Sequence, residues 1–327
     1  MIIIRYCGGL GNQMYQFAFQ TLLSLRYPNV NIKADIMHYN LLEEHNGFEL
    51  NKIFKIDVNI ASEKEIKKCY CGIIYNENYK KLPYNFRYWF AHHQWILNRI
   101  KRKMHPQIAQ KYILCAEYNV YYDKVLNLYE DKDYYLEGMW QNINYLEPIR
   151  NVLFNKFKFK HELKKDDEEW ARKIQNNNSV CIHIRRGDFL HSKFEICSEK
   201  YYEKAISLVK NELGENLSYY FFSDDIKYVK QKYQYLNKVY FVEHSSQNSD
   251  IDMHLMSLGK CNIIANSTFS FWAAFLNKRS ELCIAPRFST VDNIAKYTFS
   301  VPKSWKVLDP NSGELLDNKT DQKKVNL

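Results

Sequence analysis

Residues 180–188 (VCIHIRRGD) place two arginines directly after a short apolar run. The run predicts a β-strand whose alternate residues share one buried face. Ligands of open α/β sheets bind beyond the carboxyl ends of the strands, and a guanidinium group can bind phosphate oxygens through two hydrogen bonds. Arg185 and Arg186 therefore predict a phosphate or diphosphate site. The alternative is a solvated surface ion pair between one of these arginines and Asp188.

Two other strand-like runs end in residues that suit the same ligand. Asp224 and Asp225 follow residues 219–222, where a carboxylate can cap the next helix, orient an arginine or accept from a nucleotide hydroxyl. Residues 266–272 (NSTFSFW) follow the run 262–265. Hydroxyl groups at such a turn can donate to phosphate oxygens, with the helix amides behind them. An ordinary helix cap is the alternative, and the apolar end of this segment is typical of a core.

Residues 8–13 (GGLGNQ) lie between a strand-like N-terminus and a helix-like run at residues 14–25. Glycines there allow the backbone to approach a ligand closely, and a helix N-terminus favours an anion or a polar group. The segment is neither G-x-G-x-x-G nor a P-loop. Taken by itself, it is more typical of a tight structural turn than of a binding loop.

A metal site is only weakly indicated. Asp131 and Asp133 form an Asp-x-Asp pair, as do Asp250 and Asp252, and this spacing occurs in metal-dependent sugar transferases. Such pairs are also frequent at helix starts and in loops. The eight cysteines show no zinc-like pair of pairs.

The second half of the chain alternates strand-like and helix-like segments. This alternation predicts a parallel sheet with right-handed crossover connections. Ser198 is a typical N-cap for the first of the helices. The predicted strands are residues 180–184, 219–222, 239–242, 262–265 and 282–285. The predicted helices are residues 199–211, 225–234, 250–258 and 268–277.

The first half is less regular. Its strand, glycine turn and helix imply a second α/β layer, but no period predicts the topology of residues 42–134. At ~150 residues per domain, 327 residues suggest two domains. The polar stretch 164–178 predicts the boundary, with domains at residues 1–170 and 171–327. The polar end, from about residue 318, is expected to fray.

The net charge of +9 includes basic clusters at residues 99–103 and 156–160. They are compatible with nucleic acid, an anionic membrane face or a nucleotide-linked substrate. Nucleic acid is disfavoured because no zinc-finger, helix-turn-helix or ribonucleoprotein signature accompanies the charge. Scattered cysteines in apolar runs favour a reducing compartment. No signal peptide and no apolar run of ~18 residues is found, so the sequence predicts a cytoplasmic protein with peripheral membrane contact through its basic clusters.

Taken in order, these motifs resemble the α-1,2-fucosyltransferases of glycosyltransferase family 11. The likeness runs from about the first residue to about Pro286. The lack of a membrane anchor resembles the bacterial members rather than the Golgi ones. The matching segments are residues 8–18 (GGLGNQMYQFA), 135–141 (YLEGMWQ), 183–189 (HIRRGDF), 222–225 (FSDD), 252–253 (DM) and 263–272 (IIANSTFSFW).

The resemblance implies an α/β protein with two Rossmann-like domains facing a cleft, the GT-B arrangement. It implies an acceptor-side N-terminal domain and a C-terminal domain that binds GDP-fucose. The implied reaction transfers L-fucose, with inversion, to the 2-hydroxyl of a galactose in a surface oligosaccharide. No metal or other cofactor is obligatory in this reading.

The resemblance also implies roles for residues. Arg185 and Arg186 match arginines that bind the donor diphosphate, and His183 matches the histidine beside them. Asn262 stands near the position of an Asp that related fucosyltransferases use to contact guanine. Trp140 stands where Phe is common, a mild departure. The other implied donor-binding residues are Gly11, Asn12, Asp224, Asp225, Asn266, Ser267, Thr268, Ser270 and Phe271.

The residue types fit the implied chemistry. Departure of GDP develops negative charge while the sugar becomes oxocarbenium-like, and preorganised guanidinium groups can stabilise that leaving group. Asp188 is the hypothesised base for the acceptor proton, with His183 and Asn12 as rivals. A role for Asp188 in holding an arginine is equally compatible with its position.

Two other functions stay open at this point. One is fucosyl transfer with another linkage, such as α-1,6 or protein O-fucosylation. The other is a non-catalytic GDP-sugar-binding protein of polysaccharide assembly, against which the retained arginines and the Ser/Thr segment argue.

Overall fold

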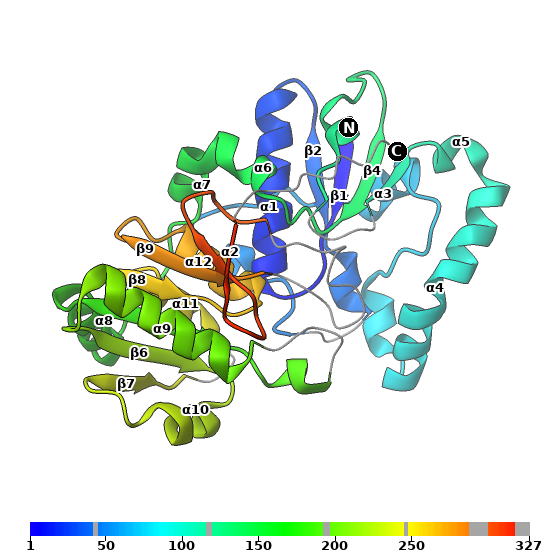
Figure 1. The fold of residues 1–327 in the computed structure, drawn as a ribbon. Coiled ribbons are helices and arrows are strands. Elements are labelled where there is room, and N and C mark those ends of the chain that lie inside the picture. The colour runs from blue at the N-terminus through cyan, green and yellow to red at the C-terminus, as the bar shows by residue number, and fades with distance from the viewer. Residues whose placement is uncertain (42–44, 116–119, 192–196, 245–247, 288–299, 318–327) are drawn as a thin grey trace. The chain divides into compact units, whose positions relative to one another are not determined.

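The computed structural model describes residues 1–41, 45–115, 120–191, 197–244, 248–287 and 300–317. The chain forms two compact units, and the second begins at Phe159 rather than at residue 171 (Figure 1). The polar stretch expected to separate them forms α8 (Lys165–Asn176) instead. This helix belongs to the second unit because Trp170 packs edge-on against Tyr220 of its sheet. The predicted fraying from residue 318 lies outside the described residues.

The first unit is built on a four-stranded parallel sheet with the order β2-β1-β4-β3. Its strands are β1 (Ile2–Arg5), β2 (Ile32–Asp35), β3 (Tyr112–Cys115) and β4 (Tyr134–Gly138). Its α-helices are α1 (Leu10–Arg26), α2 (Leu50–Ile53), α3 (Glu63–Cys69), α4 (Tyr84–Met104), α5 (Pro106–Ala109), α6 (Ile143–Leu146) and α7 (Arg150–Lys156). Short 3-10 helices are η1 (Met37–Asn40), η2 (Glu77–Lys81), η3 (Asp123–Leu126) and η4 (Glu147–Ile149).

Helix α1 starts earlier than the sequence indicated. We expected it at residues 14–25, but it begins at Leu10, so Gly11 and Asn12 form its first turn. Gly9 is the N-cap and makes no side-chain cap. Phe19 of α1 stacks on Trp140 with ring centroids 3.9 Å apart, and this contact fixes the helix beside the chain that follows β4.

The second unit contains a seven-stranded sheet with the order β11-β10-β9-β8-β5-β6-β7. Its strands are β5 (Ser179–Ile184), β6 (Ser218–Ser223), β7 (Val239–Val242), β8 (Cys261–Ile263), β9 (Leu282–Pro286), β10 (Lys306–Leu308) and β11 (Leu315–Leu316). Its helices are α8, α9 (Glu199–Leu213), α10 (Ile226–Tyr233), α11 (Ser249–Met256), α12 (Thr268–Phe275) and the 3-10 helix η5 (Asp188–His191). The pairings from β7 to β10 are parallel, and only β11 runs antiparallel to its neighbour.

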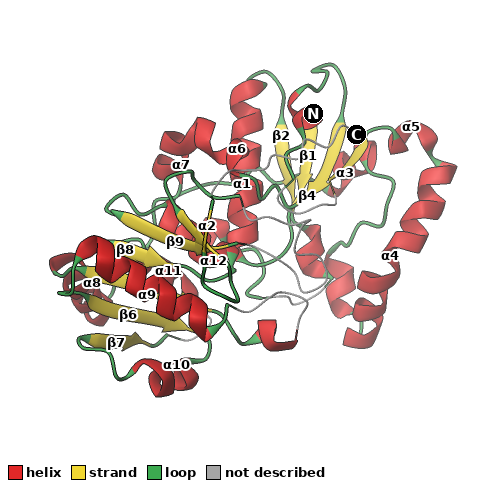
Figure 2. Ribbon diagram, in the orientation of Figure 1, coloured by secondary structure: helices red, strands yellow, loops and turns green. Residues whose placement is uncertain are grey.

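Helices cover both faces of this sheet, as Figure 2 shows. Val180, Ile182 and Ile184 of β5 pack in one core with α9 and α10. The intervening Cys181 and His183 are buried as well. The predicted alternation along β5 is therefore confirmed, and burial of both faces is what a parallel sheet requires. Ser198 caps α9 as predicted, since its hydroxyl accepts the Tyr201 N–H at 3.2 Å.

A partly buried ionic cluster joins α8, α11 and the chain after β7. His244 Nε2 lies 2.9 Å from Asp167 Oδ1, and its Nδ1 lies 2.6 Å from Asp252 Oδ1. Asp252, half of the second Asp-x-Asp pair, therefore bonds a histidine. In the first such pair, Asp133 bonds the amino group of Met1 at 3.1 Å. Among the described residues, no group of His, Cys, Asp or Glu has an arrangement that could hold a metal ion.

We expect this cluster to make the stability of the fold depend on pH. The hydrogen bond to Asp252 raises the pKa of His244 above its ordinary value. A histidine whose folded-state pKa is raised stabilises the fold fully below its unfolded pKa of about 6.5. That contribution is lost as the pH rises through the raised value. We expect the free energy of unfolding, measured with urea at a series of pH values, to fall above about pH 6.5 more steeply than in His244→Gln. Parallel profiles for the two proteins would contradict this assignment.

Candidate functional site

Two arginines and three carboxylates meet at the carboxyl ends of β5 and β6. Arg185 bonds Asp188 at 2.8 Å through Nη2 and Asp224 at 3.0 Å through Nη1. The backbone N–H of Arg186 donates to Asp224 Oδ1 at 2.9 Å. These contacts arise because β5 and β6 are parallel neighbours in register, with His183 opposite Phe222. The structure therefore brings together the first two predicted motifs.

Arg186 is held on two sides while its outer edge stays open. Its Nε bonds Asp225 Oδ2 at 3.1 Å, and its guanidinium carbon lies 3.6 Å from the centre of the Tyr228 ring. Both of its terminal nitrogens lack a hydrogen bond to any residue that the structure describes. Arg185 is more fully engaged, because both of its terminal nitrogens contact carboxylates. A preorganised, half-open guanidinium is suited to bind two phosphate oxygens.

Sequence reasoning missed Tyr228. It lies three residues after Asp225, on the first turn of α10, and Asp225 caps this turn by accepting the Tyr228 N–H at 3.3 Å. The Tyr228 hydroxyl donates to Glu199 at 2.7 Å. The sequence feature that could have revealed Tyr228 is its spacing of three residues from Asp225. In a helix this spacing places the ring beside the cap residue, which itself bonds Arg186.

Gly187 gives the loop room to pass Asp224. A Cβ atom at this position would lie 2.8 Å from Asp224 Oδ2, the oxygen that bonds Arg185. If this edge binds the diphosphate that the sequence predicts, Gly187→Ala should weaken that binding about tenfold, because displacing the carboxylate loses a charge-assisted hydrogen bond. Calorimetric titration with GDP measures the change. In an Asp224→Ala background, Gly187→Ala should reduce the affinity for GDP little further. If the losses of affinity from the two substitutions were additive, this explanation would be contradicted.

His183 is the last but one residue of β5 and is buried. Burial, with a further contribution from the charge of Arg185, lowers the pKa of His183 to about 3. The imidazole is therefore neutral at physiological pH. Its Nδ1 is buried and has no hydrogen bond to the described part of the chain. The ring lies 5.5 Å from that of Phe269, at the start of α12.

The β8–α12 turn lies beside this cluster. β8 pairs with β5 on the side opposite β6, so the strand order reverses between β5 and β8. A point of reversal is where open α/β sheets bind ligands. Ser267 is the N-cap of α12, and its side chain makes no cap hydrogen bond. Ser267 and Thr268 are partly exposed, and Asn266 is buried. These three residues have the predicted position.

Three other residues of the implied donor set lie in the core instead. Asn262 is fully buried within β8, where its amide donates to Met256 O at 2.9 Å and accepts from Asn277 at 2.7 Å. Both ends of that amide are occupied, so its predicted contact with guanine is wrong. The Ser270 hydroxyl donates within its own helix, to Ser267 O at 3.2 Å.

Phe271 is also a core residue. It is fully buried and packs on Phe275, Trp272 and Trp305, with ring centroids 5.3 to 5.8 Å apart. The predicted place of this ring beside guanosine is wrong, because the α12 face that carries it points away from solvent into the apolar interior.

Gly11 and Asn12 lie in the first unit. Asn12 Oδ1 accepts from Gln141 at 2.8 Å, which joins the first and second segments of the family-like pattern. Gly8 has φ +77°, and a Cβ there would lie 2.4 Å from Asn12 Nδ2. The glycine segment thus forms a tight turn that holds Asn12.

The first unit has its own strand-end cluster, which the sequence did not reveal. Arg5, the last residue of β1, bonds Glu137 of β4 and lies 3.0 Å from His38 Nδ1. Tyr112 donates to Glu137 at 2.8 Å. The sequence feature that could have revealed this cluster is an arginine directly after three isoleucines. Arg185 follows an apolar run in the same way.

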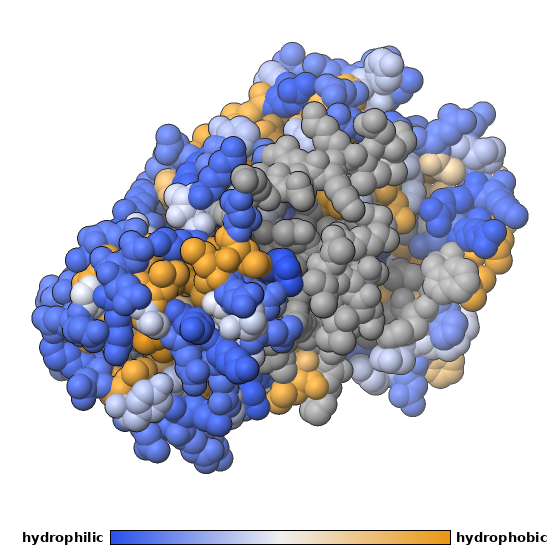
Figure 3. Space-filling view, in the orientation of Figure 1, coloured by the Kyte–Doolittle hydropathy of each residue, from blue (hydrophilic) through white to orange (hydrophobic). Residues whose placement is uncertain are grey.

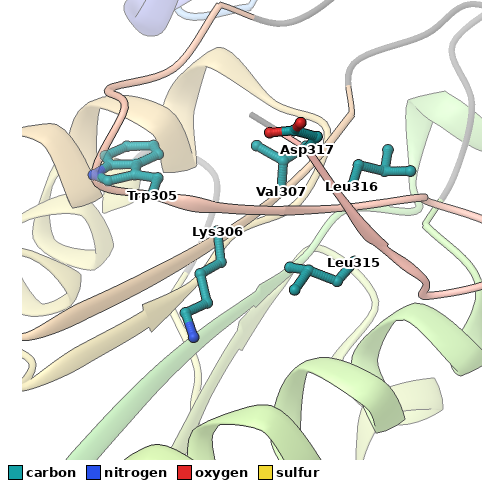
Figure 4. A pocket seen from close by; sticks show the side chains of 6 residues that line it. All are labelled: Trp305, Lys306, Val307, Leu315, Leu316 and Asp317. Carbon is teal, nitrogen blue, oxygen red and sulfur yellow. The ribbon is translucent and has the colours of Figure 1, made fainter. Parts of the chain in front are cut away.

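Two hollows of about 340 Å³ each occur among the described residues. One lies along β10 and β11 and is shown in Figure 4, where Trp305, Val307 and Leu316 are among the residues that line it. The other lies between α3 and the ends of α4 and α5. Neither is lined by the charged residues at the ends of β5 and β6.

Comparison with known proteins supplies the family. The model of glycosyl transferase family 11 matches residues 1–306. The Alpha-1,2-colitosyltransferase of Escherichia coli is 31% identical over 302 residues, which cover 88% of this chain and 91% of that protein. The O-antigen biosynthesis glycosyltransferase WbnK of Escherichia coli is 29% identical over 294 residues, covering 86% and 92%.

Among solved structures, the fucosyltransferase NodZ from Bradyrhizobium is similar, with a TM-score of 0.51 and 13% identity. The match covers 97% of this chain and 98% of NodZ. A likeness at this identity shows the fold alone. It confirms the predicted fold class, an α/β protein with two Rossmann-like units of the GT-B type.

Proposed function

The chain belongs to glycosyl transferase family 11, and we propose that it is an inverting α-1,2-fucosyltransferase. The donor in this proposal is GDP-fucose, and the acceptor is the 2-hydroxyl of a galactose in a surface oligosaccharide. The observation that carries it is the half-open Arg186 beside Arg185 at the point of strand reversal. The names of the two Escherichia coli relatives, which refer to an α-1,2 linkage and to O-antigen biosynthesis, support the linkage and the acceptor class.

In the proposed step, the acceptor oxygen forms a bond to the anomeric carbon while the bond from that carbon to the diphosphate breaks. The leaving diphosphate takes the electron pair, and Arg186 and Arg185 stabilise its growing charge. Asp225 and Tyr228 keep Arg186 in position before the donor arrives, so little reorganisation is needed. Ser267 and Thr268, with the first turn of α12, would donate to the same phosphates.

Asp188 is the best of the three candidate bases. His183, with its pKa lowered to about 3, is a weak proton acceptor at neutral pH. Asn12 carries an uncharged amide and also bonds Gln141. Asp188 is half-exposed and contacts Arg185 through Oδ1 at 2.8 Å, and its other oxygen, Oδ2, would accept the proton. Asp188 then has both roles considered from the sequence, because it also holds the arginine.

We expect transfer to persist in the presence of a chelator. Paired guanidinium groups neutralise a departing diphosphate in the way that a divalent cation does elsewhere, so this chemistry needs no metal. Initial rates with and without EDTA measure the effect. Loss of activity that Mn²⁺ or Mg²⁺ restores would contradict the expectation and would support a metal site at one of the Asp-x-Asp pairs.

The function itself is tested by incubating the protein with GDP-fucose and a panel of galactosides, then determining the linkage of the product. GDP-colitose belongs in the donor set because one relative is a colitosyltransferase. A product with fucose on the 2-hydroxyl of galactose is expected. An α-1,6 product, or GDP binding without turnover on any acceptor, would replace the proposal with one of the alternatives.

A further inference from the structure

Helix α4 of the first unit exposes an apolar stripe. The stripe consists of five apolar residues, given below, and of His93, which lies between the second and the third of them. Together these residues recur every three or four positions, so they share one face of the helix. The ring of His93 stacks on that of Trp89, with centroids 4.8 Å apart. The apolar members and their exposed fractions are Phe86 (61%), Trp89 (48%), Ile96 (40%), Ile100 (51%) and Met104 (68%).

The opposite side of α4 is the one that packs against the first unit. Asn98 Oδ1 accepts from the backbone of Ile73 at 2.9 Å, and its amide donates to the Tyr70 hydroxyl at 3.0 Å. Phe90, one turn after Phe86 and so at the border between the two sides, packs edge-on against Tyr79. A helix of a globular protein normally places its apolar side inward. An apolar stripe on the outer side therefore indicates a docking surface.

The charges around the stripe indicate what docks there. The sequence of α4 contains no Asp or Glu. Arg99, Lys101 and Lys103 are exposed and make no ion pair with a described residue. A second copy of this helix would meet the stripe with more cations and no carboxylate. An anionic surface is complementary to it.

We propose that α4 docks the protein on an anionic lipid surface. The helix would lie in the plane of the interface, with the rings of Phe86 and Trp89 among the headgroups and the basic residues on lipid phosphates. Figure 3 shows orange side chains beside blue ones along the edge where Figure 1 draws α4. Among the described helices, none has the length and apolar character needed to span a bilayer. The attachment is thus peripheral.

The test is flotation with vesicles, which needs neither donor nor acceptor and so succeeds or fails independently of the proposed function. One vesicle type contains phosphatidylcholine alone, and the other also contains phosphatidylglycerol. The apolar variant carries Phe86→Ser, Trp89→Ser and Ile96→Ser. The charge variant carries Arg99→Gln, Lys101→Gln and Lys103→Gln. Matched controls remove exposed residues outside α4: Leu25→Ser with Tyr129→Ser and Tyr235→Ser, and Lys52→Gln with Lys55→Gln and Lys227→Gln.

The unaltered protein should float with the phosphatidylglycerol vesicles and only weakly with the neutral ones. The charge variant should bind the anionic vesicles about 10²-fold more weakly, since each basic residue near such a surface contributes about fivefold. The apolar variant should lose binding at least as strongly, and both controls should keep it. Three results would overturn the proposal: no flotation with anionic vesicles, equal losses in the controls, or a stable dimer in sedimentation that only the apolar variant dissociates. The stripe residues are exposed, so the variants should have unchanged melting temperatures. A loss of vesicle binding would then not be caused by unfolding.

Discussion

Arg186→Ala should lower kcat/KM for transfer by about 10²-fold or more, the usual effect of removing a preorganised donor to a charge that develops in the transition state. The loss should fall mainly on kcat, because the leaving diphosphate carries more charge in the transition state than in the bound donor. Arg185→Ala should have an effect of similar size. It removes a second cation and also releases Asp188 and Asp224 from their ion pairs.

Arg186→Lys separates charge from geometry. A lysine keeps the positive charge but cannot bind Asp225 on one side and two phosphate oxygens on the other, so most of the loss should remain. Arg150→Ala is a suitable control, since that arginine forms a surface pair with Glu147 in the first unit. Near-normal turnover in both Arg185→Ala and Arg186→Ala would contradict the diphosphate assignment.

Phe271→Ala should lower the free energy of unfolding by about 3–5 kcal/mol, as expected when a large aromatic side chain is deleted from a core. Phe271 is fully buried among Phe275, Trp272 and Trp305, and removing its ring leaves a cavity under the turn that carries Ser267. Chemical denaturation measures the change.

Phe271→Leu tests whether the ring has any other role. Leucine retains most of the apolar volume, so it should cost less than Phe271→Ala, and GDP affinity should stay normal. If Phe271→Ala instead kept its stability while losing GDP affinity, the ring would belong to the nucleotide site after all.

The sequence predicted which residues gather at this edge of the sheet where a polar or charged residue ends an apolar run. Arg185, Asp224 and Asn266 each follow such a run, and parallel pairing brings all three to one edge. It failed for residues within a motif, because a motif gives position along the chain but not the direction of a side chain. Asn262 and Phe271 lie close to the site in sequence, yet a β8 amide bonded to Asn277 and a ring packed on Trp305 point into the interior.

Long-range packing decides what local patterns leave open. Helix α4 was hidden in residues 42–134 because the apolar residues of its stripe face outward while Asn98 faces inward, the reverse of the usual pattern. Likewise, the hydroxyls of Tyr201 and Tyr202 on α9 donate to Ile264 O at 2.7 Å and to His183 O at 3.2 Å. These two bonds hold the ends of β8 and β5, and no spacing in the sequence predicts them.

The ion pairs around the two arginines also affect how tightly the proposed nucleotide sugar and its nucleotide product would bind. Three carboxylates surround two guanidinium groups, so these five side chains carry a net negative charge. The proposed nucleotide sugar would compete with Asp188 and Asp224 for Arg185, which would lower its affinity. In the proposed reaction, Asp188 and Asp224 would bond Arg185 again after transfer, which would favour release of the nucleotide.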